Sequence, residues 1–427
     1  MNPPRTRLEQ ILMTRNLGPT EFVREFGRRA ADLGIDASTS PSALHRWITG
    51  NERPRVGSQK VLESWFSEPA AVLLGPPHSA PARESCSVED MIVESGHSSA
   101  EHAYAAASAA IDPVAVEHLQ AQVAHEARRF NTTPTLTMLQ DLIALRNRVY
   151  SQIDRTSRPR QVTELYLIAG QVCGLISAAS LDMGYADAAE EQARAVLTYG
   201  RYIESPSLEG WARALLATVA YWSGRPRHAA EHADHGLQVA AASSVRAQLH
   251  SLNARALGQL GAHDEVAQQL GAAVDQLDAG SSDPVFDEIG GELRFDRLRH
   301  AVCAASAHLA LGDGARAEAA SMEALEIASR GGEGRRLAVL AAHADLAAAR
   351  THNDDLAGAQ SALAPVLELG TARRTERLTQ RAVTLGRMLG VARYRGAAEA
   401  TTLGLALEDF TQSSLPRALP PGVKASL

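Results

Sequence analysis

Cysteine, lysine and aromatic residues are scarce in this sequence of 427 residues. The three cysteines, Cys86, Cys173 and Cys303, are odd in number and far apart, which excludes a disulfide framework and a zinc-ligand pattern. Phe, Trp and Tyr make up 4% of the chain, so small aliphatic side chains must form most of its core. Alanine supplies 77 residues, which favours helices that pack closely together.

Signals for export, membrane insertion and catalysis are also lacking. The N-terminal segment has no apolar signal-peptide core, and the longest uncharged stretch, residues 165–181, is rich in Gly, Ser and Ala, which indicates a buried helix. The sequence contains no phosphate-binding loop, dinucleotide fingerprint or Gly-x-Ser-x-Gly motif. We therefore expect a cytoplasmic protein that is not an enzyme, with no cofactor, no bound metal and no membrane partner.

Charge and composition divide the chain into a small head and a long helical body. Residues 1–75 hold ten basic and eight acidic side chains, a net charge of +2, which leaves −9 for the rest of the chain. A stretch rich in Pro, Ser and Ala follows, so residues 76–112 are predicted to be a linker with a short helix. Helical periodicity fills residues 113–412, and the proline-rich residues 413–427 are predicted to be a disordered tail.

The head contains several short helices, of which the third has two contrasting faces. Ser40 followed by Pro41 is typical of a helix start, and Gly50 is typical of a helix end. Apolar residues at positions 44, 47 and 48 share one face of this helix. The opposite face carries the hydrogen-bonding side chains Ser42, His45, Arg46 and Thr49.

Residues 47–55, WITGNERPR, resemble the end of the recognition helix in XRE-type helix-turn-helix domains, the family of the Cro and phage repressors. In that family a Trp-x-x-Gly is typically followed by basic residues and a proline. The resemblance implies that the third helix enters the major groove of double-stranded DNA, with polar side chains on base edges and basic ones on phosphates. The candidate DNA-binding residues are Thr20, Ser40, Ser42, His45, Arg46, Thr49, Arg53, Arg55 and Lys60.

Two alternatives stay open for the head. His45 and Arg46 have side chains that suit either base edges or phosphates. The whole head also fits a small helical protein-interaction module whose arginines are only solvated. Two features of the head depart from the XRE-type pattern. Ile48 stands where these domains commonly have a Glu, and the second helix with its following loop is longer than usual.

The body contains an internal repeat. If the turns lie at Gly184, Gly224, Gly261, Gly312 and His352, small residues recur five and twelve positions later. Small residues at those positions are needed where two helices of a pair cross closely. The residues five later are Ala189, Ala229, Val266, Ala317 and Ala357, and those twelve later are Val196, Gly236, Ala273, Ala324 and Ala364. Residues 113–130 and 134–155 are predicted to form an earlier pair.

This register resembles irregular tetratricopeptide repeats, and it predicts an all-α fold with a helix-turn-helix head and an α-solenoid body. In such arrays the first helix of each pair lines a concave groove that binds extended peptides or helices. The combination of head and body resembles actinobacterial XRE-tetratricopeptide regulators of development and secondary metabolism, and also peptide-sensing quorum regulators. The candidate groove residues lie on predicted first helices: Tyr166, Gln171, Trp211, Arg213, Arg246, Asn253 and Arg299.

From these patterns we predict a sequence-specific transcriptional regulator that binds DNA as a homodimer and senses a signalling peptide or small molecule through its repeats. A dimer is expected because two heads spaced one helical turn apart can read adjacent major-groove segments. The alternative is a cytoplasmic scaffold that docks partner proteins in the repeat groove.

Overall fold

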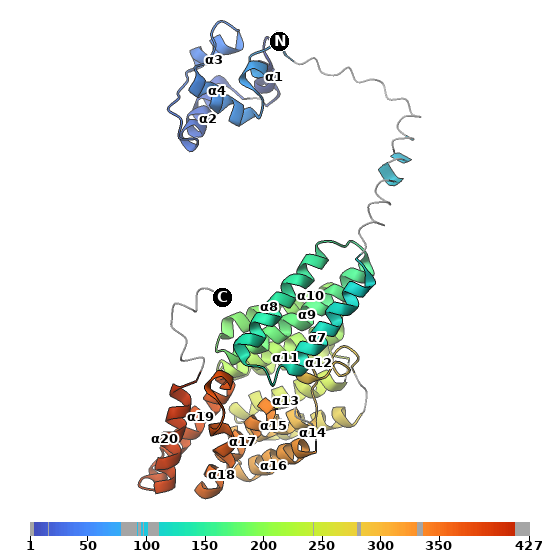
Figure 1. Ribbon diagram of the computed structural model, residues 1–427, viewed down its shortest axis with the longest axis vertical. Coiled ribbons are helices and arrows are strands. Elements are labelled where there is room, and N and C mark those ends of the chain that lie inside the picture. Colours follow the sequence, from blue (N-terminus) through green and yellow to red (C-terminus); the bar gives the residue numbers. More distant parts are fainter. Residues whose placement is uncertain are drawn as a thin grey trace. The chain divides into compact units, whose positions relative to one another are not determined.

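The computed structural model describes residues 4–15, 17–77, 92, 95–96, 98–100, 111–241, 243–279, 283–330 and 336–414. The chain forms two compact units, Met1–Glu101 and His102–Leu427. Across the described ranges the structure is helical and contains no strand, so the predicted all-α class is confirmed (Figure 1). Most of the predicted linker and tail lies outside the described residues.

The first unit is a small cluster of short helices around one apolar core. Phe22, Phe26, Leu44 and Leu62 are at most 2% exposed in this core. Ser40 caps the third helix as expected, because its Oγ accepts a hydrogen bond from the Ala43 amide. The helices are α1 (Arg7–Thr14), α2 (Pro19–Asp32), α3 (Pro41–Ile48), α4 (Val56–Phe66) and α5 (Ala70–Leu73).

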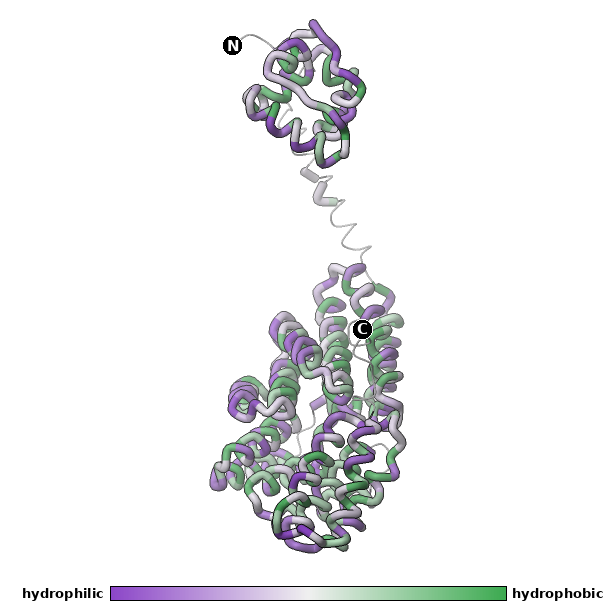
Figure 2. Tube along the Cα trace, turned by 90° about the vertical axis from the view of Figure 1, so that its left-hand side faces the viewer, coloured by the Kyte–Doolittle hydropathy of each residue, from purple (hydrophilic) through white to green (hydrophobic). Residues whose placement is uncertain are grey.

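The second unit is a row of helices in which each helix from α7 to α17 packs against the next one along the chain, while α18 packs against α17 and α20 (Figure 1). Hydrophobic and hydrophilic residues alternate along the helical turns, as expected where one face of each helix is packed (Figure 2). The helices are α7 (Pro113–Arg129), α8 (Thr135–Ile153), α9 (Pro159–Asp182), α10 (Ala186–Tyr202), α11 (Pro206–Trp222), α12 (Pro226–Val239), α13 (Ser243–Gln259), α14 (His263–Asp278), η1 (Gly291–Leu293), α15 (Arg297–Ala310), α16 (Gly314–Ser329), α17 (Arg336–His352), α18 (Leu356–Leu367), η2 (Thr371–Arg373), α19 (Glu376–Leu389), η3 (Ala392–Tyr394) and α20 (Ala398–Gln412).

Successive pairs also pack through their first helices. α11 contacts α13, α13 contacts α15, α15 contacts α17, and α17 contacts α19. Contacts between neighbouring pairs, repeated along the chain, are the organising feature of a helical solenoid. The repeat unit is therefore compatible with the predicted all-α solenoid.

The predicted repeat register is confirmed in four places. Gly184, Gly224, Gly261 and Gly312 all have positive φ and end the first helix of a pair. The residues five and twelve positions later are buried in every case. At one of them, Gly236, an added Cβ would lie 2.6 Å from Leu249 and 2.9 Å from the Arg213 Cβ, so the helices cross closely there.

The fifth register position is wrong by two residues. The turn that follows α17 places Asp354, not His352, at positive φ. The buried small residues of the next helix are accordingly Ala359 and Val366, whereas Ala357 and Ala364 are exposed. Asp tolerates the left-handed conformation better than most residues, so this turn forms without a glycine. A sequence pattern based on turn glycines therefore cannot locate it.

Helix α9 is the core helix of the repeat unit. In the part of the chain that the structure describes, it is the one helix long and apolar enough to span a bilayer by length and composition. Two thirds of its most apolar window, 67%, is buried against neighbouring helices. The prediction that residues 165–181 form a buried helix is confirmed.

A loop between α14 and α15, residues 283–296, packs along the first helices and is here called the inner loop. Phe286 of the inner loop is 1% exposed, and its ring centroid lies 4.9 Å from that of Trp211 in α11. Gln171 in α9 donates a hydrogen bond to the Val285 carbonyl at 2.8 Å. An added Cβ at Gly291 would lie 2.2 Å from the Ala127 carbonyl oxygen, so this loop also fits tightly against α7.

An ion pair joins α19, in the last helix pair, directly to α9 near the start of the array. Arg377 in α19 donates two hydrogen bonds to the carboxylate of Asp182 in α9, at 2.6 and 2.8 Å. The Asp182 side chain is 1% exposed and the Arg377 side chain is 22% exposed. Although burial alone would lower the pKa of Arg377, the Asp182 carboxylate raises it above its usual value. A contact between residues 195 positions apart thus connects an early helix of the array to its last helix pair.

Candidate functional site

The polar face of α3 is exposed, and its apolar face anchors it. Leu44 and Trp47 are 2% and 4% exposed in the core of the first unit. Ser42, His45 and Arg46 on the other side are exposed. The helix therefore presents this strip of three side chains to solvent on a rigid support, which is the arrangement that recognition by a helix face requires.

Arg46 has an intramolecular partner at the end of α3. Gly50, with φ +75°, turns the chain back so that the Asn51 and Glu52 amides donate hydrogen bonds to the Arg46 carbonyl at 2.9 and 3.2 Å. The Glu52 carboxylate forms an ion pair with the Arg46 Nε. Both side chains are about half exposed, and an exposed pair of this kind contributes at most about 1 kcal/mol. The Arg46 guanidinium is therefore available to a stronger acceptor.

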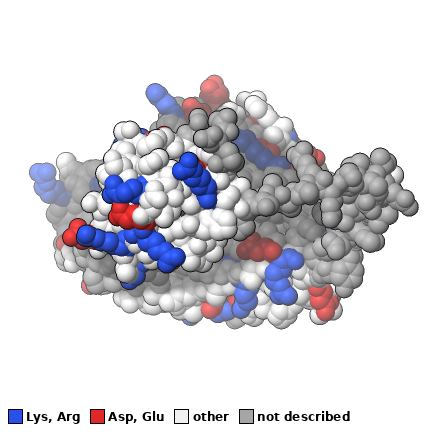
Figure 3. All heavy atoms as spheres, turned by 90° about the horizontal axis from the view of Figure 1, so that it is seen from above, with Lys and Arg blue, Asp and Glu red and all other residues white. Residues whose placement is uncertain are grey.

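The remaining candidates in the head surround this strip. Arg53, Arg55 and Lys60 are exposed, while Pro54 between the two arginines is buried. Thr20 is exposed in the first turn of α2, and the Thr49 hydroxyl donates to the His45 carbonyl at 2.8 Å. Figure 3 shows basic side chains over the face of the first unit that it presents, with acidic groups beside some of them.

Three of the seven predicted groove residues meet the inner loop. Gln171 and Trp211 are almost fully buried, at 4% and 3% exposed, by their contacts with Val285 and Phe286. Arg299 donates hydrogen bonds to the Glu292 and Arg294 carbonyls of the inner loop. It also forms an ion pair with the Glu292 carboxylate, at 3.1 Å. The chain's own loop thus occupies part of the surface on which a ligand was predicted.

The other four predicted groove residues face second helices of the pairs. The Tyr166 ring packs against Tyr199 and Tyr202 in α10. Arg213 approaches His232 in α12, with 3.5 Å between Nη1 and Nδ1. Arg246 and Asn253, both in α13, form hydrogen bonds to α12 and the residue that follows it. Arg246 donates to the Leu237 and Ala240 carbonyls, and Asn253 donates to the Asp234 carboxylate.

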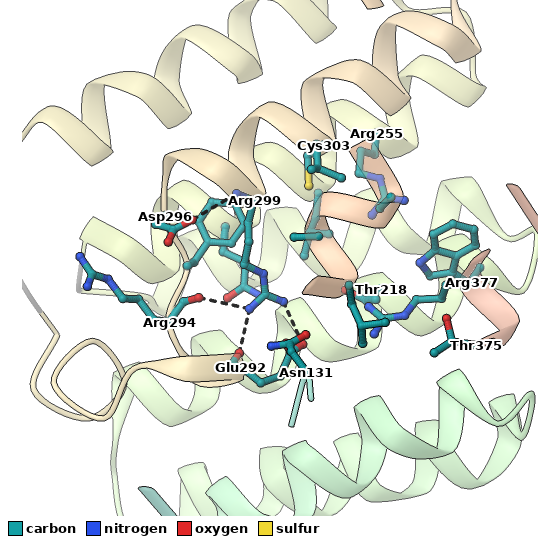
Figure 4. A pocket seen from close by; sticks show the side chains of 18 of the residues that line it. Asn131, Thr218, Arg255, Glu292, Arg294, Asp296, Arg299, Cys303, Thr375 and Arg377 are labelled. Atoms are coloured by element: carbon teal, nitrogen blue, oxygen red, sulfur yellow. Dashed lines mark hydrogen bonds and ion pairs between the residues drawn. The ribbon is translucent and has the colours of Figure 1, made fainter. Parts of the chain in front are cut away.

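A pocket of about 120 Å³ lies beside the inner loop, on the side of the later repeats. Its walls come from α11, α13, α15, α17, α19 and the inner loop (Figure 4). Leu252, Val302, Ala338 and Ala341 supply apolar surface. The charged lining residues are Arg255, Arg294, Arg299, Arg377, Arg381, Glu292 and Asp296.

Three of these arginines are neutralised by carboxylates. Arg299 binds Glu292, and Arg377 binds Asp182. Arg381 Nε donates to Asp345 at 2.9 Å, and Asp345 also accepts a hydrogen bond from Ser306. Their charges serve to hold the inner loop, α9, α17 and α19 together around the pocket.

The other two arginines of the pocket, Arg255 and Arg294, form no ion pair with a described carboxylate; Arg294 is exposed, whereas Arg255 in α13 is buried, and sequence reasoning missed it. It is 6% exposed, and its Nε and Nη2 are buried without a hydrogen-bond partner among the described residues. The guanidinium carbon lies 4.1 Å from the Tyr221 ring centroid and 5.1 Å from that of Trp222. An arginine between two alanines, Ala254 and Ala256, on a predicted first helix was the available sequence signal.

His300, near the pocket in α15, predicts a pH-dependent stability. Burial, together with the charge of Arg297, lowers the pKa of His300 to about 4. The unfolded chain binds this proton near pH 6.5, so the contribution of neutral His300 to stability is complete above that pH and is lost as the pH falls. We expect the free energy of unfolding to drop by about 2 kcal/mol between pH 6.5 and pH 5 because of this group.

Urea unfolding of the wild type and of His300→Asn at several pH values measures this effect. The variant, which has no imidazole at this position, is expected to show the smaller decline on acidification. His125→Asn, at an exposed position in α7, is the matched control and should follow the wild type. Equal pH profiles for wild type and His300→Asn contradict the prediction.

No protein-family model and no curated protein matches this chain. Within the described residues, no group of three or more His, Cys, Asp or Glu side chains is arranged to hold a metal ion. The exposed face of α3 and the pocket are therefore the two candidate functional sites of the described chain.

Proposed function

We propose that this protein is a sequence-specific DNA-binding transcriptional regulator, with an XRE-type helix-turn-helix head and a tetratricopeptide-like repeat domain that senses a ligand and mediates dimerisation. The observation that carries the proposal is the exposed strip of Ser42, His45 and Arg46 on α3, held by the buried Leu44 and Trp47. In this proposal α3 reads base edges in the major groove, because a helix fits there and these side chains offer donors and acceptors.

The residues around the strip suit the phosphate backbone. Arg53 and Arg55 are exposed on the segment that follows α3, and Lys60 is exposed on α4. The backbone N–H groups at the start of α3 supply further donors for a phosphate. Such contacts set the position of the head on the duplex, while the strip on α3 supplies the sequence preference.

The repeat domain is proposed to couple a ligand to the spacing of two heads in a homodimer. Two heads read a site together only if they stand about 34 Å apart, one helical turn of DNA. A ligand that binds one curvature of the array more tightly shifts the population toward that curvature, and a coupling of about 1 to 3 kcal/mol is enough to change DNA affinity. The pocket beside the inner loop supports this role because five first helices and the inner loop line it.

Capture of genomic DNA fragments by the full-length protein, followed by titration of the enriched fragment against a shuffled sequence of equal composition, tests the proposal. We expect binding to the enriched fragment to be at least a thousandfold tighter than to the shuffled one, as for specific DNA-binding proteins in general. Equal affinity for both sequences refutes DNA reading. That result favours the alternative, a scaffold that docks partner proteins on the repeat domain.

A further inference from the structure

We propose that the pocket of the repeat domain binds a small organic carboxylate, with Arg255 as the residue that holds the carboxylate group. This inference deepens the ligand-sensing part of the proposed function, because it names the class of ligand. It is carried by an arginine that is buried in a pocket wall and forms no ion pair with any carboxylate of the described residues.

The positive charge of Arg255 is not neutralised within the described chain. Arg299, Arg377 and Arg381 each have a carboxylate partner, but no described carboxylate forms an ion pair with Arg255. Asp345 is the carboxylate that acts on Arg255 electrostatically, and it is already bonded to Arg381 and Ser306. A buried arginine remains charged, so a site of this kind is expected to take an anion.

The unsatisfied donors have the geometry that a carboxylate requires. Nε and Nη2 lie on the same edge of the guanidinium, and neither has a hydrogen-bond partner in the part of the chain that the structure describes. Two parallel N–H groups on one edge match the two oxygens of a carboxylate. In Figure 4 the guanidinium groups of Arg255 and Arg377 lie on one side of the pocket, and Arg299 with its bonds to Glu292 lies on another.

The size and the walls of the pocket select a compact apolar body for this anion. The pocket volume of about 120 Å³ is somewhat below that of an engineered apolar cavity, about 150 Å³, that holds one benzene molecule, so the apolar part of a ligand is limited to at most one small ring. Leu252, Val302 and Ala341 line the pocket, as does the indole ring of Trp222. Trp222 lies under the guanidinium groups of both Arg255 and Arg381, at 5.1 and 4.8 Å from its ring centroid. A carboxylic acid with one ring fits this combination.

The neighbouring charged residues connect the proposed ligand site to other helices of the array. Arg377 connects the pocket to Asp182 in α9, and Arg381 connects it to Asp345 in α17. Glu292 and Asp296 are the acidic lining residues; Arg299 binds the first, and the second caps α15. An anion at Arg255 therefore adds its charge to the network that joins α9, α17 and α19.

Calorimetric titration of the full-length protein with benzoate, in the absence of DNA, tests the inference. Benzamide, which has the same ring and no charge, is the matched ligand, and inorganic phosphate tests for an anion without an apolar body. We expect benzoate to bind at least tenfold more tightly than either. Equal affinity for benzoate and benzamide, or no binding of benzoate, overturns the proposal.

Arg255→Met removes the charge at nearly constant length and is expected to weaken benzoate binding at least tenfold. Arg227→Met, at an exposed position in α12, is the matched control and should bind benzoate like the wild type. Without ligand, Arg255→Met should have a melting temperature equal to or above that of the wild type, because it removes an unpaired buried charge. A lower melting temperature with unchanged benzoate affinity shows that Arg255 is only a packing residue.

The two proposals fail separately. Loss of sequence preference in the DNA titration leaves benzoate binding unaffected, since that measurement contains no DNA. Failure of benzoate to bind leaves the reading of DNA by α3 in place. If Arg255→Met does not fold, Arg255→Lys, which keeps the charge and lacks the paired donors, should still bind benzoate at least threefold more weakly than the wild type.

Discussion

Asp182→Asn is expected to lower the free energy of unfolding of the repeat unit by about 3 kcal/mol, because it leaves the Arg377 charge buried without a counter-ion. The two residues join α9 to α19, two helices that are far apart in sequence and in direct contact in the structure. Urea unfolding measures the loss. Hydrogen–deuterium exchange should place the largest loss of protection in α19 and α20, since pairs at the end of an array have neighbours on one side only.

Two further variants separate charge burial from the loss of a surface contact. Glu164→Gln removes the exposed pair between Arg160 and Glu164 in α9, and it should change stability by less than about 0.5 kcal/mol. Asp182→Asn combined with Arg377→Met removes both buried charges and should recover much of the stability lost in the single variant. If Asp182→Asn costs no more than Glu164→Gln, the ion pair does not stabilise the contact between α9 and α19.

Arg46→Ala is expected to weaken binding to the cognate DNA site by about 1 to 3 kcal/mol, roughly tenfold to more than a hundredfold, with little effect on random DNA. Arg53→Ala is expected to reduce affinity for all sequences and to lower the slope of log K against log salt concentration by about one. The difference follows from their positions: Arg46 stands on the exposed face of α3, and Arg53 follows the helix beside the buried Pro54.

Fluorescence anisotropy on cognate and shuffled duplexes at several salt concentrations distinguishes the two effects. Arg160→Ala, at a position 92% exposed in the repeat unit, is the matched control and should bind like the wild type. Glu52→Gln should tighten binding, because it removes both the competing partner of Arg46 and a negative charge. Equal losses on specific and random DNA for Arg46→Ala and Arg53→Ala would falsify the assignment of α3 as the reading helix.

The local structure of this protein could be predicted from sequence because it depends on neighbouring residues. The cap at Ser40, the four glycine turns of the repeat and the buried position of small residues five and twelve places later all follow from short-range sterics and hydrogen bonding. The prediction failed where this local signal was missing. Asp354 takes the place of a turn glycine, so the pattern placed that turn two residues too early.

The pocket could not be predicted in the same way, because its parts come from distant segments of the chain. Helical periodicity identified the first helices but not which of their faces meet the next pair, so Tyr166 and Arg246 were expected in a groove and instead contact second helices. The inner loop carries no repeat signal, and it covers Gln171 and Trp211.

The sequence by itself determined the helical class, the two parts of the chain and the exposed polar face of α3, since each depends on residues a few positions apart. Only the tertiary structure decided which arginines have carboxylate partners. Asp182 and Arg377 are 195 residues apart, and the lone charge of Arg255 becomes evident only when the partners of all the others are known. Charge compensation depends on distance in space, and composition does not report it.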